Sequence, residues 1–192
     1  MQRKLWKKKA GKYKGLQIVA GLVMLILMWG NTVKAQEPVF PTPTGNPAQL
    51  FYLQRTPNVN TIVCELKYEE NGAMDTTNPV HVFWIRYGEQ GQRAELSFIQ
   101  RKFAYGVSAK KVGVEKYELH FVSYKKYSMY LMKGTDRKFH VYASINKKWV
   151  ILNRIYIKIK EGGSFWSPNI EHVELYGSDP ITGEAVMETM KV

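Results

Sequence analysis

The chain has 192 residues, with 28 basic and 16 acidic side chains and a formal net charge of +12. Eight of the basic residues lie within the first 35, so the rest of the chain carries 20 basic and 16 acidic residues, a net charge of +4. This small excess excludes a dedicated nucleic-acid-binding protein, in which basic residues are more numerous and clustered. The single cysteine, Cys64, excludes an intrachain disulfide, so stability depends on a hydrophobic core.

Residues 1–35 have the pattern of an export signal peptide. Seven basic residues lie in the first 15, and an apolar run of 14 residues follows from Leu16 to Trp29. As a helix this run would be about 21 Å long, which is short of the roughly 30 Å hydrocarbon core of a bilayer. We therefore expect cleavage after Ala35, which leaves Gln36 as the new N-terminus. An uncleaved membrane anchor is the alternative, and both readings place the domain outside the cytoplasm.

Residues 36–49 contain four prolines and no regular apolar period, which predicts an extended linker. Residues 50–192 are numerous enough to bury a hydrophobic core, and we expect one β-rich domain. Apolar and polar residues alternate across Asn58–Tyr68, which predicts a strand with Cys64 on its buried face. The next strand, Val80–Tyr87, is apolar on both faces, as expected of a central strand.

The segment Gly91–Gly106 breaks this alternation. Its apolar residues follow helical spacing and predict the one substantial helix of the domain, with Gly106 as the left-handed residue that ends it. The residues of this stripe are Ala94, Leu96, Ile99, Phe103 and Ala104.

Five strand-like segments then follow in quick succession. Their short connections leave no room for crossover helices, so they predict an antiparallel meander. We therefore expect an α+β fold that is mainly antiparallel β. The sheet is either a curled meander or a partly open barrel, with one helix packed across it. The five segments are Lys116–Tyr124, Tyr127–Lys133, Arg137–Asn146, Trp149–Lys160 and Ile170–Gly177.

Three histidines, His120, His140 and His172, lie on the polar faces of these strands. The meander places successive histidines two strands apart, about 9.6 Å at the usual strand spacing. Zinc requires imidazole nitrogens at about 2.0 to 2.1 Å from a common point, so we expect no metal site and no cofactor. Nucleophilic catalysis has no support either, because a G-x-S-x-G motif is absent and a buried Cys64 thiol is inert.

The most distinctive polar motif is the segment from Gln54 to Thr61. Its Arg55, Asn58 and Asn60 precede a buried strand and could bind an anionic or hydroxylated ligand. Pairing with the next strand would bring His81 or Arg86 alongside them, depending on the register. The alternative is structural: the asparagines stabilise their own turn, and Arg55 pairs with a carboxylate.

Aromatic residues are concentrated in the C-terminal half, where nine of them fall between positions 117 and 156, interleaved with lysines. The outer phase of the strand Trp149–Lys160 adds a basic ribbon of Arg154, Lys158 and Lys160 around Tyr156. Such faces can bind glycans or acidic envelope polymers, although tyrosine is also favoured in strands in general.

Three stretches of the sequence resemble a bacterial family catalogued as domain of unknown function 4833. They are LFYLQRTPNVNTIVCEL, NPVHVFWIRYGEQG and ELSFIQRKFAYGV, and the resemblance covers roughly Leu50 to Met190. It implies an exported or envelope-associated domain with no assigned activity. The family therefore supplies no catalytic residue.

The favoured function is non-enzymatic: binding of an apolar or glycan-like ligand, or of a partner protein, in the cell envelope. One alternative is an envelope hydrolase or isomerase that uses Arg55, Asn58, Asn60 and His81. Another is an assembly factor whose exposed sheet edge pairs with a second chain. The expected partners include no nucleic acid, and a membrane only through an uncleaved N-terminal helix.

Overall fold

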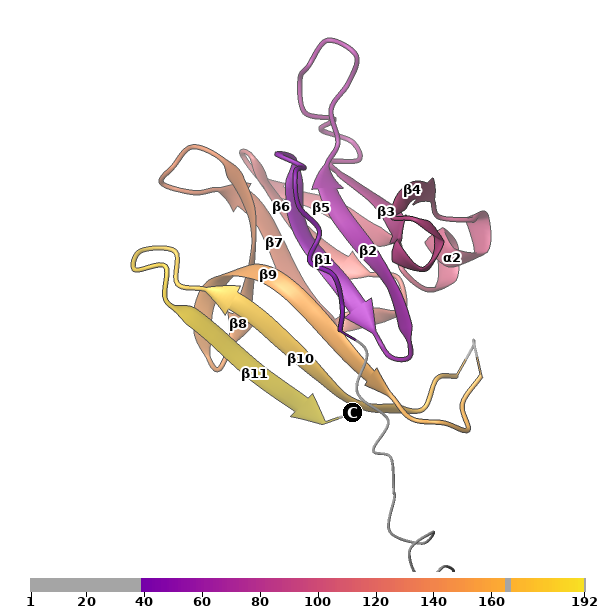
Figure 1. Cartoon of the computed structure of the whole chain (residues 1–192). Coiled ribbons are helices and arrows are strands. Elements are labelled where there is room, and N and C mark those ends of the chain that lie inside the picture. Colours follow the sequence, from indigo (N-terminus) through magenta and orange to yellow (C-terminus); the bar gives the residue numbers. More distant parts are fainter. Residues whose placement is uncertain (1–38, 165–166, 192) are drawn as a thin grey trace, which may run out of the picture. The chain divides into compact units, whose positions relative to one another are not determined.

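The computed structural model describes residues 39–164 and 167–191 (Figure 1). The predicted signal peptide, residues 1–35, lies outside them. The strands are β1 (Gln49–Arg55), β2 (Asn58–Leu66), β3 (Val80–Arg86), β4 (Gln92–Glu95), β5 (Val107–Gly113), β6 (Lys116–Phe121), β7 (Tyr124–Lys133), β8 (Phe139–Ile145), β9 (Lys148–Ile159), β10 (Ile170–Ser178) and β11 (Ala185–Lys191). The helices are the 3-10 turn η1 (Tyr87–Glu89) and α2 (Phe98–Phe103).

The strands form two antiparallel meanders, β1 to β4 and β5 to β11, in one curled sheet. The predicted meander is confirmed, and its five segments match β6 to β10 within three residues at each end. The prediction of a mainly antiparallel sheet needs one correction, because β1 pairs with β9 in parallel. That pair joins the two meanders, so the sheet is mixed.

Strand β9 is the junction of the sheet. Arg154 pairs with Tyr52 of β1 and with Tyr176 of β10, so these two strands lie on opposite edges of β9. Ile151 likewise has partners in both β8 and β10. Strands β8 and β1 therefore follow one another along the same edge, and β10 follows the other.

One hydrophobic core serves both meanders. Phe51 of β1 and Phe121 of β6 meet edge to face with ring centroids 6.1 Å apart, although their strands are not neighbours in the sheet. The sheet must therefore curl around the core, as Figure 1 shows. Cys64 is fully buried in this core, as its strand phase predicted, and burial raises the pKa of its thiol well above the ordinary range.

The predicted helix over Gly91–Gly106 was wrong in length and in packing. The first part of that segment is strand β4, where Ala94 pairs with Trp84 of β3 and packs against the core. Only six residues remain for α2, and none of them is buried, so the helix does not pack across the sheet. Pairing of β4 with β3 covers an edge of the sheet and turns Ala94 towards the core, which a helix over the same residues would not do. No helix of the described residues is long and apolar enough to span a bilayer.

Local chemistry sets both ends of α2. The Ser97 hydroxyl oxygen accepts from the Gln100 amide, and the Ser97 amide donates to the Gln100 side-chain oxygen, which forms a capping box. After the helix, the chain returns so closely that a Cβ on Gly106 would lie 1.9 Å from the Arg101 carbonyl oxygen. The glycine is therefore required for close approach, and not for a left-handed end as predicted.

The described part of the predicted linker, residues 39–48, lies against the domain. The Phe40 ring meets Tyr156 at 5.5 Å, and the Pro41 carbonyl accepts from the Gln54 side chain at 2.8 Å. Further on, Asn46 donates to Glu65 at 2.7 Å. This segment thus follows the outer face of β1 and β2, the face opposite the core.

Candidate functional site

The asparagines of the predicted polar motif serve their own connections. The Asn58 side-chain oxygen accepts from the Asn60 amide at 2.8 Å, which is an Asx turn. The Asn60 oxygen accepts from the Gly88 amide at 2.9 Å and ties β2 to η1. Both asparagine side-chain oxygens therefore accept hydrogen bonds from backbone amides, as the structural interpretation expects.

Arg55 has no carboxylate partner among the described residues, contrary to the structural interpretation of the motif. Its guanidinium carbon lies 5.5 Å from the Tyr105 ring centroid, and its buried Nε atom has no hydrogen-bond partner in the described chain. Burial raises the pKa of Tyr105, and the nearby guanidinium opposes that shift. Arg55 thus keeps a hydrogen-bond donor, its Nε, that no described residue accepts from.

The β2–β3 register places Arg86 and His81, the two candidate partners of this motif, at different positions along β2. Thr61 lies opposite Ile85, so the neighbouring Arg86 comes to the Asn60 end, where it forms an ion pair with Glu89 at 3.1 Å. His81 lies opposite Glu65, four residues further along β2, about 13 Å away at the usual rise per residue. The five predicted site residues therefore do not form one cluster.

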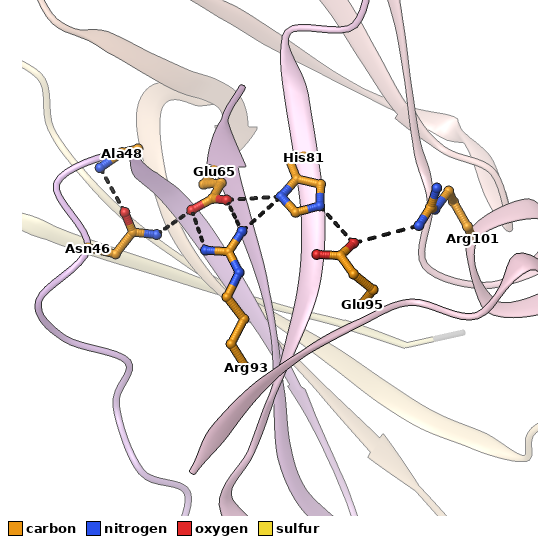
Figure 2. A network of polar contacts seen from close by, with 7 residues as sticks. All are labelled: Asn46, Ala48, Glu65, His81, Arg93, Glu95 and Arg101. Atoms are coloured by element: carbon orange, nitrogen blue, oxygen red, sulfur yellow. Dashed lines mark hydrogen bonds and ion pairs between the residues drawn. The ribbon is translucent and has the colours of Figure 1, made fainter. Parts of the chain in front are cut away.

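His81 belongs instead to an ionic network on the outer face of β2, β3 and β4 (Figure 2). Its Nδ1 lies 2.9 Å from Glu65, and its Nε2 lies 2.9 Å from Glu95. Arg93 donates to both carboxylate oxygens of Glu65, and Arg101 approaches Glu95 at 3.6 Å. The sequence reasoning missed Glu65 and Arg93, although both stand on the polar phase of predicted or observed strands.

An aromatic floor supports this network. The Arg93 guanidinium carbon lies 3.6 Å from the centroid of the Phe83 ring, and the His81 ring stacks on the same ring at 5.8 Å. Arg93 also approaches His81 Nδ1 at 3.1 Å. Since a guanidinium only donates, Nδ1 accepts from Arg93 when unprotonated and donates to Glu65 when protonated. The charged side chains of the network pair with one another, which indicates that their role is to hold β2, β3 and β4 together.

Glu65 is the most enclosed charge of the network, with a side chain that is 11% exposed. Desolvation acts to raise the pKa of its carboxyl group, but hydrogen bonds from Arg93, His81 and Asn46 outweigh it and hold the pKa below the ordinary value. A carboxylate with a depressed pKa stabilises the fold above the pKa of the unfolded chain and loses that contribution as the pH falls.

The three histidines of the C-terminal meander are each next to a single acidic residue. His120 lies 3.4 Å from Glu118, and His172 lies 3.3 Å from Glu174. His140 lies 2.9 Å from Asp136. Within residues 39–164 and 167–191, no three histidine, cysteine or acidic side chains converge on a point where a metal ion would fit.

The outer face of β6 to β9 carries a cluster of rings, which we call the aromatic face. Trp149 stacks on Tyr142 with centroids 6.1 Å apart and planes at 12°, and it meets Tyr130 at 5.5 Å. The Lys116 ammonium lies 5.2 Å from the Tyr130 centroid. Tyr142 is only 5% exposed, whereas Trp149 remains 43% exposed. The indole of Trp149 is therefore fixed by contacts with the two tyrosine rings, while part of its surface remains accessible to solvent.

Polar groups border the aromatic face on its β6 side. Glu118 accepts from Ser128 at 3.2 Å and from the Tyr130 hydroxyl at 3.5 Å. His120 faces the same carboxylate, and its buried Nδ1 has no hydrogen-bond partner among the described residues. Register produces this juxtaposition, because Glu118 lies opposite Tyr130, and Tyr130 lies opposite Tyr142.

We predict that replacing Glu65 with glutamine lowers the free energy of unfolding by about 1 to 3 kcal/mol at pH 7, because Arg93 and His81 lose the negative charge and one of the two acceptor oxygens that they share. The difference should shrink as the pH falls through the depressed pKa of Glu65, where the wild-type carboxyl group is also neutral. Urea unfolding of both proteins from pH 7 to pH 3 measures this.

The matched control is Glu89→Gln, which removes an exposed ion pair with Arg86 and should cost less than about 0.5 kcal/mol. Equal losses in the two variants, or a Glu65→Gln difference that is constant with pH, would contradict the assigned role of Glu65.

Arg55→Lys tests whether the unpaired Nε serves a ligand. Lysine keeps the charge but loses the planar fork, so a binding role predicts weaker binding of anions at an unchanged melting temperature. Anion binding is measured by the shift in melting temperature on titration with inorganic phosphate and with acetate. A lower melting temperature with no change in the anion response would leave Arg55 a purely structural role.

Comparison with known proteins supplies the family. No curated protein and no solved structure matches this chain significantly. A family model described as a domain of unknown function, DUF4833, matches residues 51–189. The match begins within β1 and ends within β11, and it includes the His81 network and the aromatic face. The chain belongs to the domain of unknown function 4833 family.

Proposed function

We propose that this chain is an exported, non-enzymatic binding module of the cell envelope that takes a glycan-like ligand on the aromatic face. The observation that carries the proposal is Trp149, which stays 43% exposed while Tyr142 and Tyr130 fix its orientation. A tryptophan that only filled space would lie with its ring covered, since burial of so large an apolar surface is favourable.

The surroundings of Trp149 suit the two sides of a sugar ring. The apolar C–H face of the ring can stack on the indole, because the stacked aromatic pair is rigid and loses little entropy on binding. The hydroxyl groups of the ring can then bond to Lys116 and Glu118 at the border of the aromatic face. Apolar contact and convergent polar groups together favour a hydroxylated ligand over a purely apolar one.

The alternative functions receive less support. The hydrolase or isomerase interpretation needs Arg55, Asn58, Asn60 and His81 in one place, whereas the register holds His81 about 13 Å along β2 from Thr61. Assembly through a sheet edge has one observation in its favour, because β4, β5 and β11 each pair with a single strand and leave the other edge without a strand partner in the described chain.

We expect Trp149→Ala to weaken glycan binding at least about tenfold without loss of the fold, because the variant removes the stacking surface but no core residue. A glycan array of bacterial envelope oligosaccharides identifies the ligand, and calorimetry with that oligosaccharide measures the affinity. Tyr68→Ala is the control, since Tyr68 is a 52% exposed aromatic residue outside the aromatic face. No retained glycan, or equal affinities for Trp149→Ala and wild type, would refute the proposal.

Export has its own test. The short apolar run of residues 16–29 supports cleavage over anchoring, so mature protein should begin at Gln36. Intact-mass analysis of protein from the source envelope measures this, and an N-terminus at Met1 in most molecules would show an anchored form instead.

A further inference from the structure

The short helix α2 presents its large apolar residues to solvent. Phe98 is 72% exposed, Ile99 48% and Phe103 51%. Lys102 stands between the two phenylalanines, with its ammonium 5.4 Å from one ring centroid and 5.5 Å from the other. Single exposed apolar residues need no explanation, but three in a six-residue helix form a patch.

The exposure of this patch does not result from a loose helix. Trp84 donates to the Gln100 side chain at 3.4 Å, and the Tyr105 ring packs edge to face on Trp84 at 5.3 Å. Arg101 also donates to the Leu96 carbonyl at 3.3 Å. These contacts and the capping box fix α2, which lies at the periphery of the domain beside β3 and β4 (Figure 1). The exposure of its phenylalanines is therefore a feature of a well-anchored helix.

A second segment extends the patch. The turn between β6 and β7 is attached to the end of α2, because Ser123 donates to the Ala104 carbonyl at 2.6 Å and the Val122 amide donates to Gly106 at 2.9 Å. Tyr124 follows directly and is 51% exposed, and Lys125 and Lys126 after it are exposed as well. We call these residues with α2 the basic–aromatic tip.

The charge of the tip is strongly positive. Four cations lie here, namely Arg101, Lys102, Lys125 and Lys126. Among the described residues, the one ion pair that involves any of them joins Arg101 to Glu95 at 3.6 Å. Rings and an isoleucine among flexible cations match the membrane interface, where apolar groups enter the headgroup region and lysines reach anionic lipids. A protein partner with an apolar groove would gain nothing from this many cations unless it were acidic.

We propose that the basic–aromatic tip docks the domain on a membrane surface rich in anionic lipids. Phe98, Ile99 and Phe103 enter the interface, and the four cations contact lipid phosphates. Tyr124 of the tip and Tyr130, which contacts Trp149, are six residues apart on β7, about 20 Å at the usual rise per residue. This docking is therefore independent of the proposed ligand. It would hold a cleaved, mature domain at a membrane without a spanning helix.

Residues 38–192 form one compact unit that contains every strand, so residues 36–192 are suitable for the test and avoid the apolar leader. The probe is sedimentation with vesicles of phosphatidylcholine that contain about 30% phosphatidylglycerol, a fraction that gives a negative surface potential. We expect binding at low salt, weaker binding at about 0.5 M salt, and little binding to pure phosphatidylcholine vesicles.

Two charge-reversal variants separate the tip from overall charge. Lys102→Glu with Lys125→Glu should weaken binding to the anionic vesicles roughly thirtyfold or more. Lys110→Glu with Lys111→Glu changes the net charge equally at exposed positions of β5, and should retain most of the binding. Phe98→Ser with Phe103→Ser should also release the domain, whereas Val114→Ser with Ile181→Ser should not, although both control residues are more than 90% exposed.

The fold of each variant is checked by circular dichroism and melting temperature. Absence of binding to the anionic vesicles by the folded wild-type domain would overturn the proposal. Equal losses in the two charge-reversal variants would overturn it too, because binding would then follow net charge and not the tip.

Discussion

The parallel pairing of β1 with β9 is the constraint on which the rest of the structure depends. Each meander alone would have one apolar face exposed to water, because a curled sheet buries a core only when its far strands meet. The β1–β9 ladder brings them together, and Thr56 reinforces it by exchanging side-chain hydrogen bonds with both backbone groups of Ile159. The Phe51–Phe121 contact across the core follows from that closure.

Much of the fold could be predicted because alternation is a local signal. The strands β6 to β10 and the burial of Cys64 follow from the period of apolar residues alone. Strand β5 has the sequence VSAKKVG, in which apolar and polar residues alternate only over the first four positions, and so short a signal does not identify a strand. The helix prediction failed because Ala94 and Leu96 fit both a helical stripe and a strand, and pairing with β3 decides between them only in three dimensions.

The candidate sites depended on register, which the sequence leaves open. Glu65 and Arg93 read as ordinary surface charges until the β2–β3 register places Glu65 opposite His81, and the Arg93 side chain, which starts opposite Ile85, reaches this pair across the Phe83 ring. Likewise, the aromatic content of the C-terminal half was visible, but not its division between a buried Tyr117 and an outward Tyr130 that supports Trp149. The outer surface consequently has two characters. Over β2 and β3 it is closed by paired charges and by residues 39–48, whereas over β7 to β9 it is open.

The junction at β9 also dictates an order of events during folding. Its contacts join residues as far apart as Thr56 and Ile159, which are 103 positions apart in the chain. Strands β1 to β4 can pair as soon as they are synthesised. The free edge of β1, however, has no partner until β9 is synthesised, which is after more than half of the domain. Contacts of such long range slow folding, and an open strand edge in the meantime invites association with other chains. A domain built this way benefits from chaperone cover until its C-terminal meander has appeared.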